Sequence, residues 1–171
     1  MNQSDLIQQI KEAFAEVPKP YNHFGIYTAR AHDEYEEPTE EEQAQDRMLD
    51  RYDLTPLQMH ECYTALSFLE PAGFHYYLPA FMILALQQNE IKEKALKDSI
   101  VFESTDFALN PTQNLDLKDY QEKRFRRLTQ SQIDAILAYL QQRQQMHSWN
   151  HKFYEKVIHY WANRRGADLL T

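Results

Sequence analysis

The stretch FHYYLPAFMILAL, at residues 74–86, decides the fold class. Its apolar residues first repeat at helical spacing, and after Pro79 they cover every side of the expected helix. A helix that is apolar all round is typical of one buried in the middle of a domain. We therefore expect a buried central helix at residues 79–88. Because proline lacks the N–H that an interior helical turn needs, we also expect a kink or a break at Pro79.

Helix signals continue on the N-terminal side of this stretch. Residues 21–33 are expected to form an irregular connector rich in aromatic side chains. A capping box at Thr39 and Glu42 then predicts an acidic helix that reaches about Tyr52. A second capping box at Thr55 begins a helix that we expect to continue to Glu70.

The C-terminal side carries similar signals. A capping box at Thr129 predicts one more amphipathic helix, and a final helix is expected over residues 150–165, ending at Gly166. Residues 100–109 could form short strands or loop anchors. Together these patterns predict a mainly α fold, a single-domain helical bundle of about six or seven helices with at most a short hairpin near 100–109.

The composition excludes several classes of protein. With 171 residues, of which 43% are hydrophobic and 13% aromatic, the chain suits a single domain and is too apolar to be disordered. One cysteine excludes an internal disulfide framework, and three glycines leave no Gly-rich phosphate loop. The N-terminus lacks the apolar run of a signal peptide, and no apolar run approaches the roughly 20 residues that span a bilayer. We expect a cytoplasmic protein with no membrane partner, organised as one domain over residues 1–171.

The formal net charge of −8 belongs to one acidic segment. Residues 33–53 hold ten acidic and two basic side chains, whereas the rest of the chain balances to zero. Such a run is usually a solvated face. It can instead steer a basic partner, or pair with the basic cluster at residues 118–127, where each exposed pair adds little stability. If a protein partner binds here, the residues expected at the contact are Glu36, Glu37, Glu40, Glu41, Glu42, Asp46, Asp50, Tyr27 and Tyr35.

Near the C-terminus, four ligand-type residues follow one another at four-residue intervals: His147, His151, Glu155 and His159. Residues four apart share a helix face, and paired imidazoles at that spacing can bind Zn, Ni or Cu. Each step turns about 40° around the axis, so all four cannot reach one ion. One interpretation is a metal site of three of these residues completed by His32 or His75, and the other is a polar border of the final helix. The three residues assigned to the metal are His151, Glu155 and His159.

Three further clusters give weaker signals. His60 and Cys62 could form an activated thiol, but residues two apart on a helix do not face each other, and a buried structural thiol is the simpler interpretation. The aromatic loop that contains His23 and His32 could form a binding surface or cover the edge of the core. Residues 123–127, KRFRR, have the pattern of a single-strand nucleic-acid site, which the overall charge of −8 argues against.

Several motifs occur in a characteristic order: AF and VPKP at residues 13–20, ALSFL at 65–69, FHYYLPAFM at 74–82 and LTQSQ at 128–132. Together they resemble a family of small bacterial proteins classed as a domain of unknown function. The most specific part is the signature Phe-x-Tyr-Tyr-Leu-Pro-Ala-Phe. The resemblance covers about residues 1–140 and leaves the final helix outside. It implies a compact helical domain in the bacterial cytoplasm, and it brings no activity, cofactor or catalytic residue.

Two functions remain after these exclusions. The first is a non-catalytic protein-binding module without a cofactor, for example an immunity or antitoxin-like inhibitor that docks on a basic partner through its acidic surface. The second is a metal-dependent enzyme or metal sensor, in which Zn or another divalent transition metal on the histidine stripe would activate a water. We favour binding, because the charge is localised and no catalytic motif stands out. Homodimerisation is left open.

Overall fold

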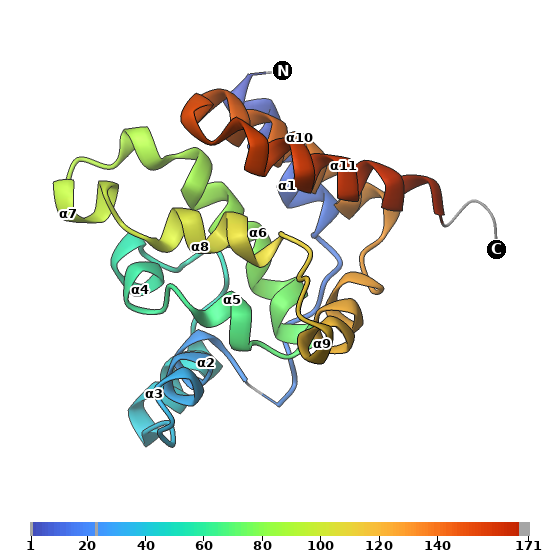
Figure 1. Ribbon diagram of the computed structural model, residues 1–171. Helices are drawn as coiled ribbons and strands as arrows, with labels where there is room; N and C mark the ends of the chain where they lie inside the picture. Colours follow the sequence, from blue (N-terminus) through green and yellow to red (C-terminus); the bar gives the residue numbers. More distant parts are fainter. Residues whose placement is uncertain (1, 23, 168–171) are drawn as a thin grey trace. The chain divides into compact units, whose positions relative to one another are not determined.

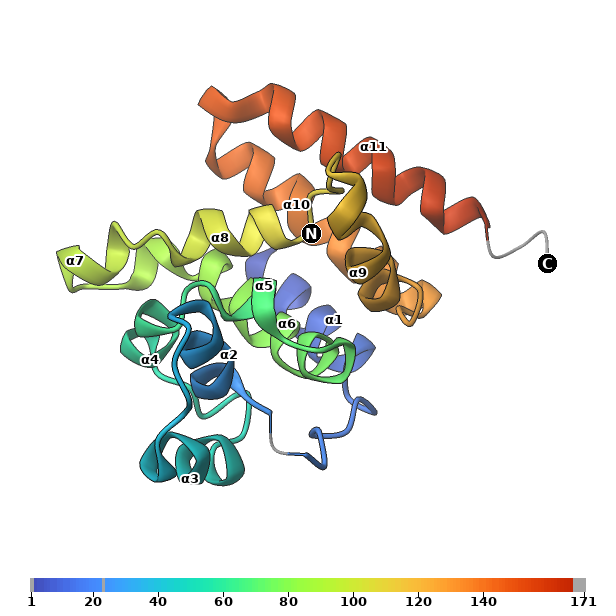
Figure 2. The same ribbon diagram turned by 60° about the horizontal axis from the view of Figure 1, so that its bottom comes forward.

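The protein is described by a computed structural model that covers residues 2–22 and 24–167 (Figures 1 and 2). Within these residues every regular element is a helix, so the mainly α class is confirmed. No helix among them is both long and apolar enough to cross a bilayer. The elements are α1 (Gln3–Ala13), α2 (Ile26–Asp33), α3 (Glu40–Met48), α4 (Pro56–Glu61), α5 (Ala65–Phe68), α6 (Pro71–Leu86), α7 (Lys94–Lys97), α8 (Val101–Ala108), α9 (Leu115–Phe125), α10 (Gln130–Met146) and α11 (His151–Ala167), with 3₁₀ turns at Gln88–Glu90 and Ser148–Asn150.

The chain divides into two compact units. Unit 1 comprises residues 1–15 and 109–171, and unit 2 comprises residues 16–108. The two units differ in charge: unit 2 has 18 acidic and 7 basic residues, whereas unit 1 has 8 acidic and 11 basic residues. Their formal charges are therefore −11 and +3. The expectation of one domain over residues 1–171 stays a prediction.

Helix α6 contains the apolar stretch at residues 74–86 and belongs to unit 2. Every residue from Gly73 to Leu86 is buried, which confirms the predicted burial of this stretch. The helix begins at Pro71, ahead of the buried stretch expected from Pro79, and it runs through Pro79 without interruption. Of the two alternatives expected at Pro79, a kink or a break, the break is wrong. An interior proline costs about 3 kcal/mol, but each large apolar side chain that the continuous helix buries returns about 1.5–3 kcal/mol.

Residues 100–109 form a helix where the sequence had left a hairpin open. The buried residues of α8 include Val101, Phe102, Thr105 and Ala108, a spacing that follows the helical period. The Thr105 hydroxyl donates to the Val101 carbonyl at 2.7 Å, a bond that exists only in a helical turn. Helix α8 packs on α5 and α6, so tertiary contacts decide a segment too short for its pattern to decide alone.

Three boundaries in unit 2 differ from the sequence-based expectation. Helix α2 occupies most of the stretch expected to be an irregular connector, and α3 ends at Met48 before reaching Tyr52. The helix expected to run to Glu70 is interrupted after α4 and resumes as the short α5. The capping boxes at Thr39 and Thr55 are both formed, so the predicted starts of α3 and α4 are confirmed.

In unit 1, α10 packs on both α1 and α11 (Figure 2). Helix α1 buries Leu6 and Ile10 on one face, and the predicted capping box at Thr129 opens α10. Trp161 of α11 is fully buried against the Phe125 ring, with ring centres 4.7 Å apart. The Trp161 indole N–H donates to the Leu109 carbonyl at 2.9 Å, which satisfies its one polar atom inside the core.

An ion pair joins α9 to α11 within unit 1. The Glu122 carboxylate accepts hydrogen bonds from both terminal nitrogens of Arg164, at 3.1–3.2 Å, and from the Tyr160 hydroxyl at 3.0 Å. Burial alone would raise the pKa of Glu122, but these hydrogen bonds, together with the charges of Arg164 and Arg126, lower it below its ordinary value.

A lowered carboxyl pKa makes this pair pH-dependent. The stabilisation is complete above the ordinary Glu pKa of about 4.3 and is lost as the pH falls through the lowered value of the folded state. We expect Glu122→Gln to reduce the free energy of unfolding by about 1–2 kcal/mol at pH 7, and by much less below pH 4. Urea unfolding at both pH values measures this difference. Glu155→Gln, at an exposed carboxylate on α11, should change little at either pH, and an equal loss in both variants would contradict the assignment.

Candidate functional site

One group of exposed acids in unit 2 lies around the start of α3. Glu36 and Glu37 precede the helix, and Glu40 and Glu41 occupy its first turn; all four side chains are exposed. Within the described residues, no hydrogen bond or ion pair engages these four carboxylates. Carboxylates in the first turn of a helix are favoured by its positive end, which makes this a stable position for negative charge. The four acids and the neighbouring Tyr35 are called the acidic surface below.

Asp46 was expected among the exposed contact residues, but the structure buries it, so it does not belong to this surface. Its side chain is only 1% exposed. The carboxylate accepts hydrogen bonds from the backbone N–H groups of Gly25, Tyr27 and Thr28 at 2.9–3.2 Å, and from the Thr28 hydroxyl at 2.7 Å. These donors are the unpaired N–H groups at the N-terminus of α2, so Asp46 of α3 caps a neighbouring helix.

The Asp46 cap explains two local features. Burial raises the pKa of Asp46, whereas the hydrogen bonds from Thr28, Tyr27 and Gly25 lower it, and burial is the larger effect. Glycine is required at position 25, because a Cβ there would collide with the Asp46 carboxylate and lie 2.8 Å from the Tyr77 hydroxyl.

Two other predicted contact residues are also used inside unit 2. Tyr27 is 6% exposed and belongs to the core, so it cannot present its ring to a partner. Glu42 pairs with Arg30 of α2 and completes the capping box with Thr39, whose backbone N–H it accepts at 2.7 Å. The hydrogen bonds from Thr39 and Arg30 lower the pKa of Glu42 in spite of its partial burial. Glu42 therefore holds α2 and α3 together.

Asp50 is exposed, but its carboxylate has a partner. The Tyr76 hydroxyl donates to it at 2.8 Å, and the backbone N–H of Tyr52 donates to it at 3.1 Å. Partial burial would raise the pKa of Asp50, but these bonds and the charges of Arg51 and Lys19 lower it. Asp50 thus contributes charge near α3 while it fixes the chain that follows the helix.

Tyr35 combines complete exposure with an unfavourable backbone conformation. Its side chain is 99% exposed, and its φ of 58° lies in the left-handed region that normally requires glycine. The Tyr35 N–H donates to the backbone carbonyl of His32, and the Glu36 N–H donates to the backbone carbonyl of Ala31. These are the two hydrogen bonds of a Schellman motif, which closes α2. No local sequence pattern predicts this conformation, because tyrosine is unusual at such a position.

The histidine stripe of α11 does not converge. His151 Nε2 lies 3.1 Å from a carboxylate oxygen of Glu155, and His151 also contacts Gln144. His159 instead contacts Asn163, at 2.9 Å. His147 precedes the helix as the residue before a 3₁₀ turn. Across the described part of the chain, no three His, Cys, Asp or Glu side chains come close enough to share an ion. The geometry is that of the polar border of a helix.

The other described histidines and Cys62 make packing or hydrogen-bond contacts typical of structural residues. His60 Nδ1 lies 2.7 Å from the Ser99 hydroxyl, and Cys62 is fully buried, which raises the pKa of its thiol to about 12. A nucleophilic cysteine needs the opposite, a lowered pKa. His75 is buried beside the Phe74 ring, and His32 is exposed and packs edge-on against Phe24. His23, of the same aromatic loop, lies outside the described residues.

The basic stretch at residues 123–127 is not a stacking platform. Its aromatic residue, Phe125, is fully buried against Trp161, and Arg124 is 6% exposed with its guanidinium over the Tyr120 ring. Arg126 is exposed and pairs with Glu122. A single-strand site needs an exposed ring on which a base can stack, and this stretch lacks one.

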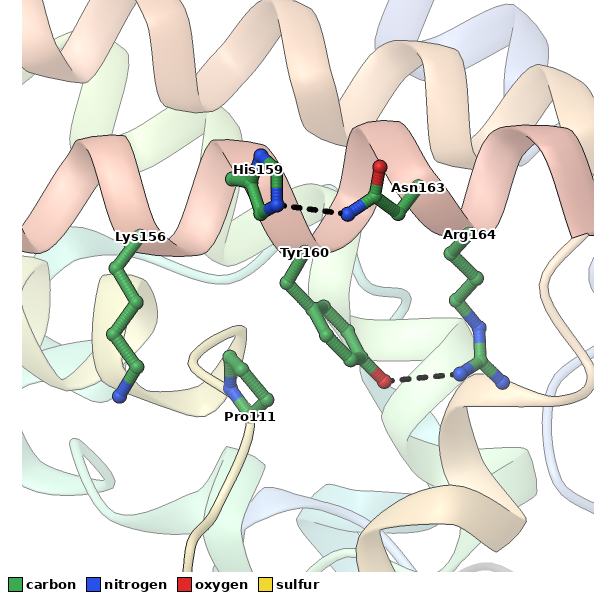
Figure 3. Close-up of a pocket in the computed structure, with 6 residues that line it drawn as sticks. All are labelled: Pro111, Lys156, His159, Tyr160, Asn163 and Arg164. Carbon is green, nitrogen blue, oxygen red and sulfur yellow. Dashed lines mark hydrogen bonds between the residues drawn. The ribbon is translucent and has the colours of Figure 1, made fainter.

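Unit 1 carries an open pocket of about 460 Å³ against α11 (Figure 3). One wall is Pro111, in the segment between α8 and α9, and the other residues lie on one face of α11. Figure 3 shows the Lys156 and Tyr160 side chains extending from the helix on either side of Pro111. The lining residues are Pro111, Lys156, His159, Tyr160, Asn163 and Arg164. Of these residues the sequence pattern singled out only His159, as a metal ligand, and the other five carry no motif.

Comparison with known protein families gives a match over most of the chain. A family model, described as a family of unknown function (DUF6714), matches residues 2–165. The chain belongs to this family. The match includes most of α11, so DUF6714 extends beyond residue 140, where the resemblance noted from the motifs ended. It therefore spans both the acidic surface and the α11 pocket. No curated protein and no solved structure matches the chain.

The cap made by Asp46 gives a direct test of the distinction between buried and exposed acids. We expect Asp46→Ala to lower the free energy of unfolding by about 2–3 kcal/mol, because it leaves buried N–H groups of α2 without a partner. Glu41→Ala, at an exposed acid of the same helix, should change it by less than about 0.5 kcal/mol. Urea unfolding followed by circular dichroism measures both, and equal stability of the two variants would refute the structural role of Asp46.

Proposed function

We propose that this member of DUF6714 is a non-catalytic protein-binding module, which engages a basic partner through the acidic surface of unit 2. The observation that carries the proposal is the grouping of four exposed carboxylates, Glu36, Glu37, Glu40 and Glu41, beside the fully exposed ring of Tyr35. An aromatic ring next to like charges combines apolar contact area with long-range attraction. Both are typical of a protein-binding surface.

The surroundings of the surface support this proposal. Asp46 and the Arg30–Glu42 pair hold α2 to α3, so the segment between these helices is attached at both ends. A surface that is ordered before binding loses less conformational entropy when a partner arrives. Within unit 2, a net charge of −11 adds to the local field and favours a cationic partner.

The form of binding that these features favour is inhibition. Carboxylates on a rigid surface can occupy a cationic active site in place of phosphate groups, as an immunity or antitoxin-like inhibitor of a nuclease would do. We place this activity in the bacterial cytoplasm, with a basic protein as the partner. Association should be fast at low ionic strength and slow down as salt is added, because exposed charges are screened beyond about 8–10 Å.

The first test is capture of the partner from a lysate of the source organism. The four substitutions Glu36→Gln, Glu37→Gln, Glu40→Gln and Glu41→Gln remove the charge of the acidic surface and keep the side-chain shapes. The matched control makes the same change at four exposed acids elsewhere in unit 2, which are Glu16, Glu61, Glu93 and Glu103. We expect one stoichiometric partner, identified by mass spectrometry, with wild type and control and not with the surface variant. A partner retained by the surface variant would contradict the proposal.

The second test separates binding from folding at Tyr35. A left-handed conformation costs a non-glycine residue about 1–2 kcal/mol, and glycine removes this cost. Glycine also loses more conformational entropy on folding, which offsets about 0.5–1 kcal/mol of that gain. We therefore expect Tyr35→Gly to raise the free energy of unfolding by about 0.5–1 kcal/mol and to weaken partner binding at least about tenfold. Urea unfolding and calorimetry with the captured partner measure the two effects. Unchanged affinity would exclude Tyr35 from the contact.

A further inference from the structure

The α11 pocket of unit 1 has a chemistry opposite to that of the acidic surface. Unit 1 carries a formal charge of +3, and none of the six residues that line the pocket is acidic. Its volume of about 460 Å³ lies in the range of small-molecule sites, which is about 300–1,000 Å³.

One wall, Pro111, is fixed by hydrogen bonds on both sides. The Gln121 side chain donates to the Asn110 carbonyl at 2.8 Å and accepts from the Thr112 N–H at 2.7 Å. Two residues before Pro111, the Leu109 carbonyl accepts from the buried Trp161 indole. The chain on either side of Pro111 is therefore attached to α9 and α11, and the proline ring presents a rigid apolar face to the pocket.

The second wall, Tyr160, is held just as firmly. Its ring packs edge-on against Trp161, with centres 5.4 Å apart, and lies 6.1 Å from the Phe125 ring. Its hydroxyl donates to Glu122 at 3.0 Å. Burial raises the pKa of Tyr160 to about 12, so its phenol stays neutral at physiological pH. The neutral Tyr160 ring and the Pro111 ring are the apolar part of the pocket lining, and both are suited to contact with a flat group.

The charge of the pocket comes from Lys156. Arg164 contributes a guanidinium, but both of its terminal nitrogens are bound to Glu122, which balances its charge. Lys156 is exposed on α11, and Figure 3 shows its side chain reaching from the helix toward the level of Pro111. His159 and Asn163 contact each other at 2.9 Å along the same side of the helix and offer further hydrogen-bonding groups.

From this arrangement we propose that the α11 pocket binds a small organic anion that carries one carboxylate or phosphate beside a flat apolar ring. The ring packs against Pro111 and Tyr160, and the anionic group pairs with Lys156. This ligand site is independent of the acidic surface, since all its residues belong to unit 1.

The experiment titrates the full chain with probes that separate ring from charge, and follows the His159 and Tyr160 ring signals by NMR. Benzoate and phenyl phosphate carry both features, inorganic phosphate carries only the charge, and benzyl alcohol carries only the ring. We expect saturable shifts with at least one of the two aryl anions, with binding at least about tenfold tighter than that of inorganic phosphate or benzyl alcohol. The tighter of the two aryl anions identifies the anionic group.

Two lysine variants assign the charge. Lys156→Met removes the ammonium group and keeps a long unbranched side chain, so we expect at least about fivefold weaker binding of the aryl anion. Lys152→Met makes the same change one turn earlier on α11, at an exposed lysine outside the pocket lining, and should leave the affinity unchanged. The proposal is overturned if neither aryl anion gives a saturable shift, if inorganic phosphate binds as tightly as phenyl phosphate, or if the two lysine variants bind alike.

Discussion

The structure of the acidic segment depends on one buried carboxylate. Asp46 of α3 accepts hydrogen bonds from three backbone N–H groups and a hydroxyl at the start of α2. A helix N-terminus without such a partner would leave buried donors unsatisfied, at about 1–3 kcal/mol each. The cap brings α2 against α3, with the Arg30–Glu42 pair as a second connection. Asp46 therefore has a structural role inside unit 2 and does not add to its exposed charge.

The separation of charge between the two units changes how the whole-chain value of −8 should be interpreted. A net charge of −8 taken alone argues against any anionic ligand, yet unit 1 carries +3 and its pocket has no acidic lining residue. Electrostatic attraction acts over about one Debye length, roughly 8–10 Å, so the local distribution matters more than the total. An acidic protein can thus hold a basic partner at one surface and a small anion at another.

The sequence predicted those features that depend on neighbouring residues. The capping boxes of Thr39, Thr55 and Thr129 and the burial of α6 follow from short-range patterns, and the structure confirms them. Features that depend on distant residues were missed. Asp46 appeared to be one more exposed acid because its partners lie about twenty positions away, and the α11 pocket needs Pro111 from a different part of the chain.

The conformation of Tyr35 bears on the choice between a solvated face and a binding surface. A solvated charge run accounts for Glu36, Glu37, Glu40 and Glu41, since exposed acids cost little in water. It does not account for a fully exposed tyrosine in a position that favours glycine, because that residue costs about 1–2 kcal/mol in backbone energy and buries no ring in return. Folding alone would be better served by glycine. Tyr35 lies directly beside the exposed acids, where contact between its ring and a partner would offset this backbone energy.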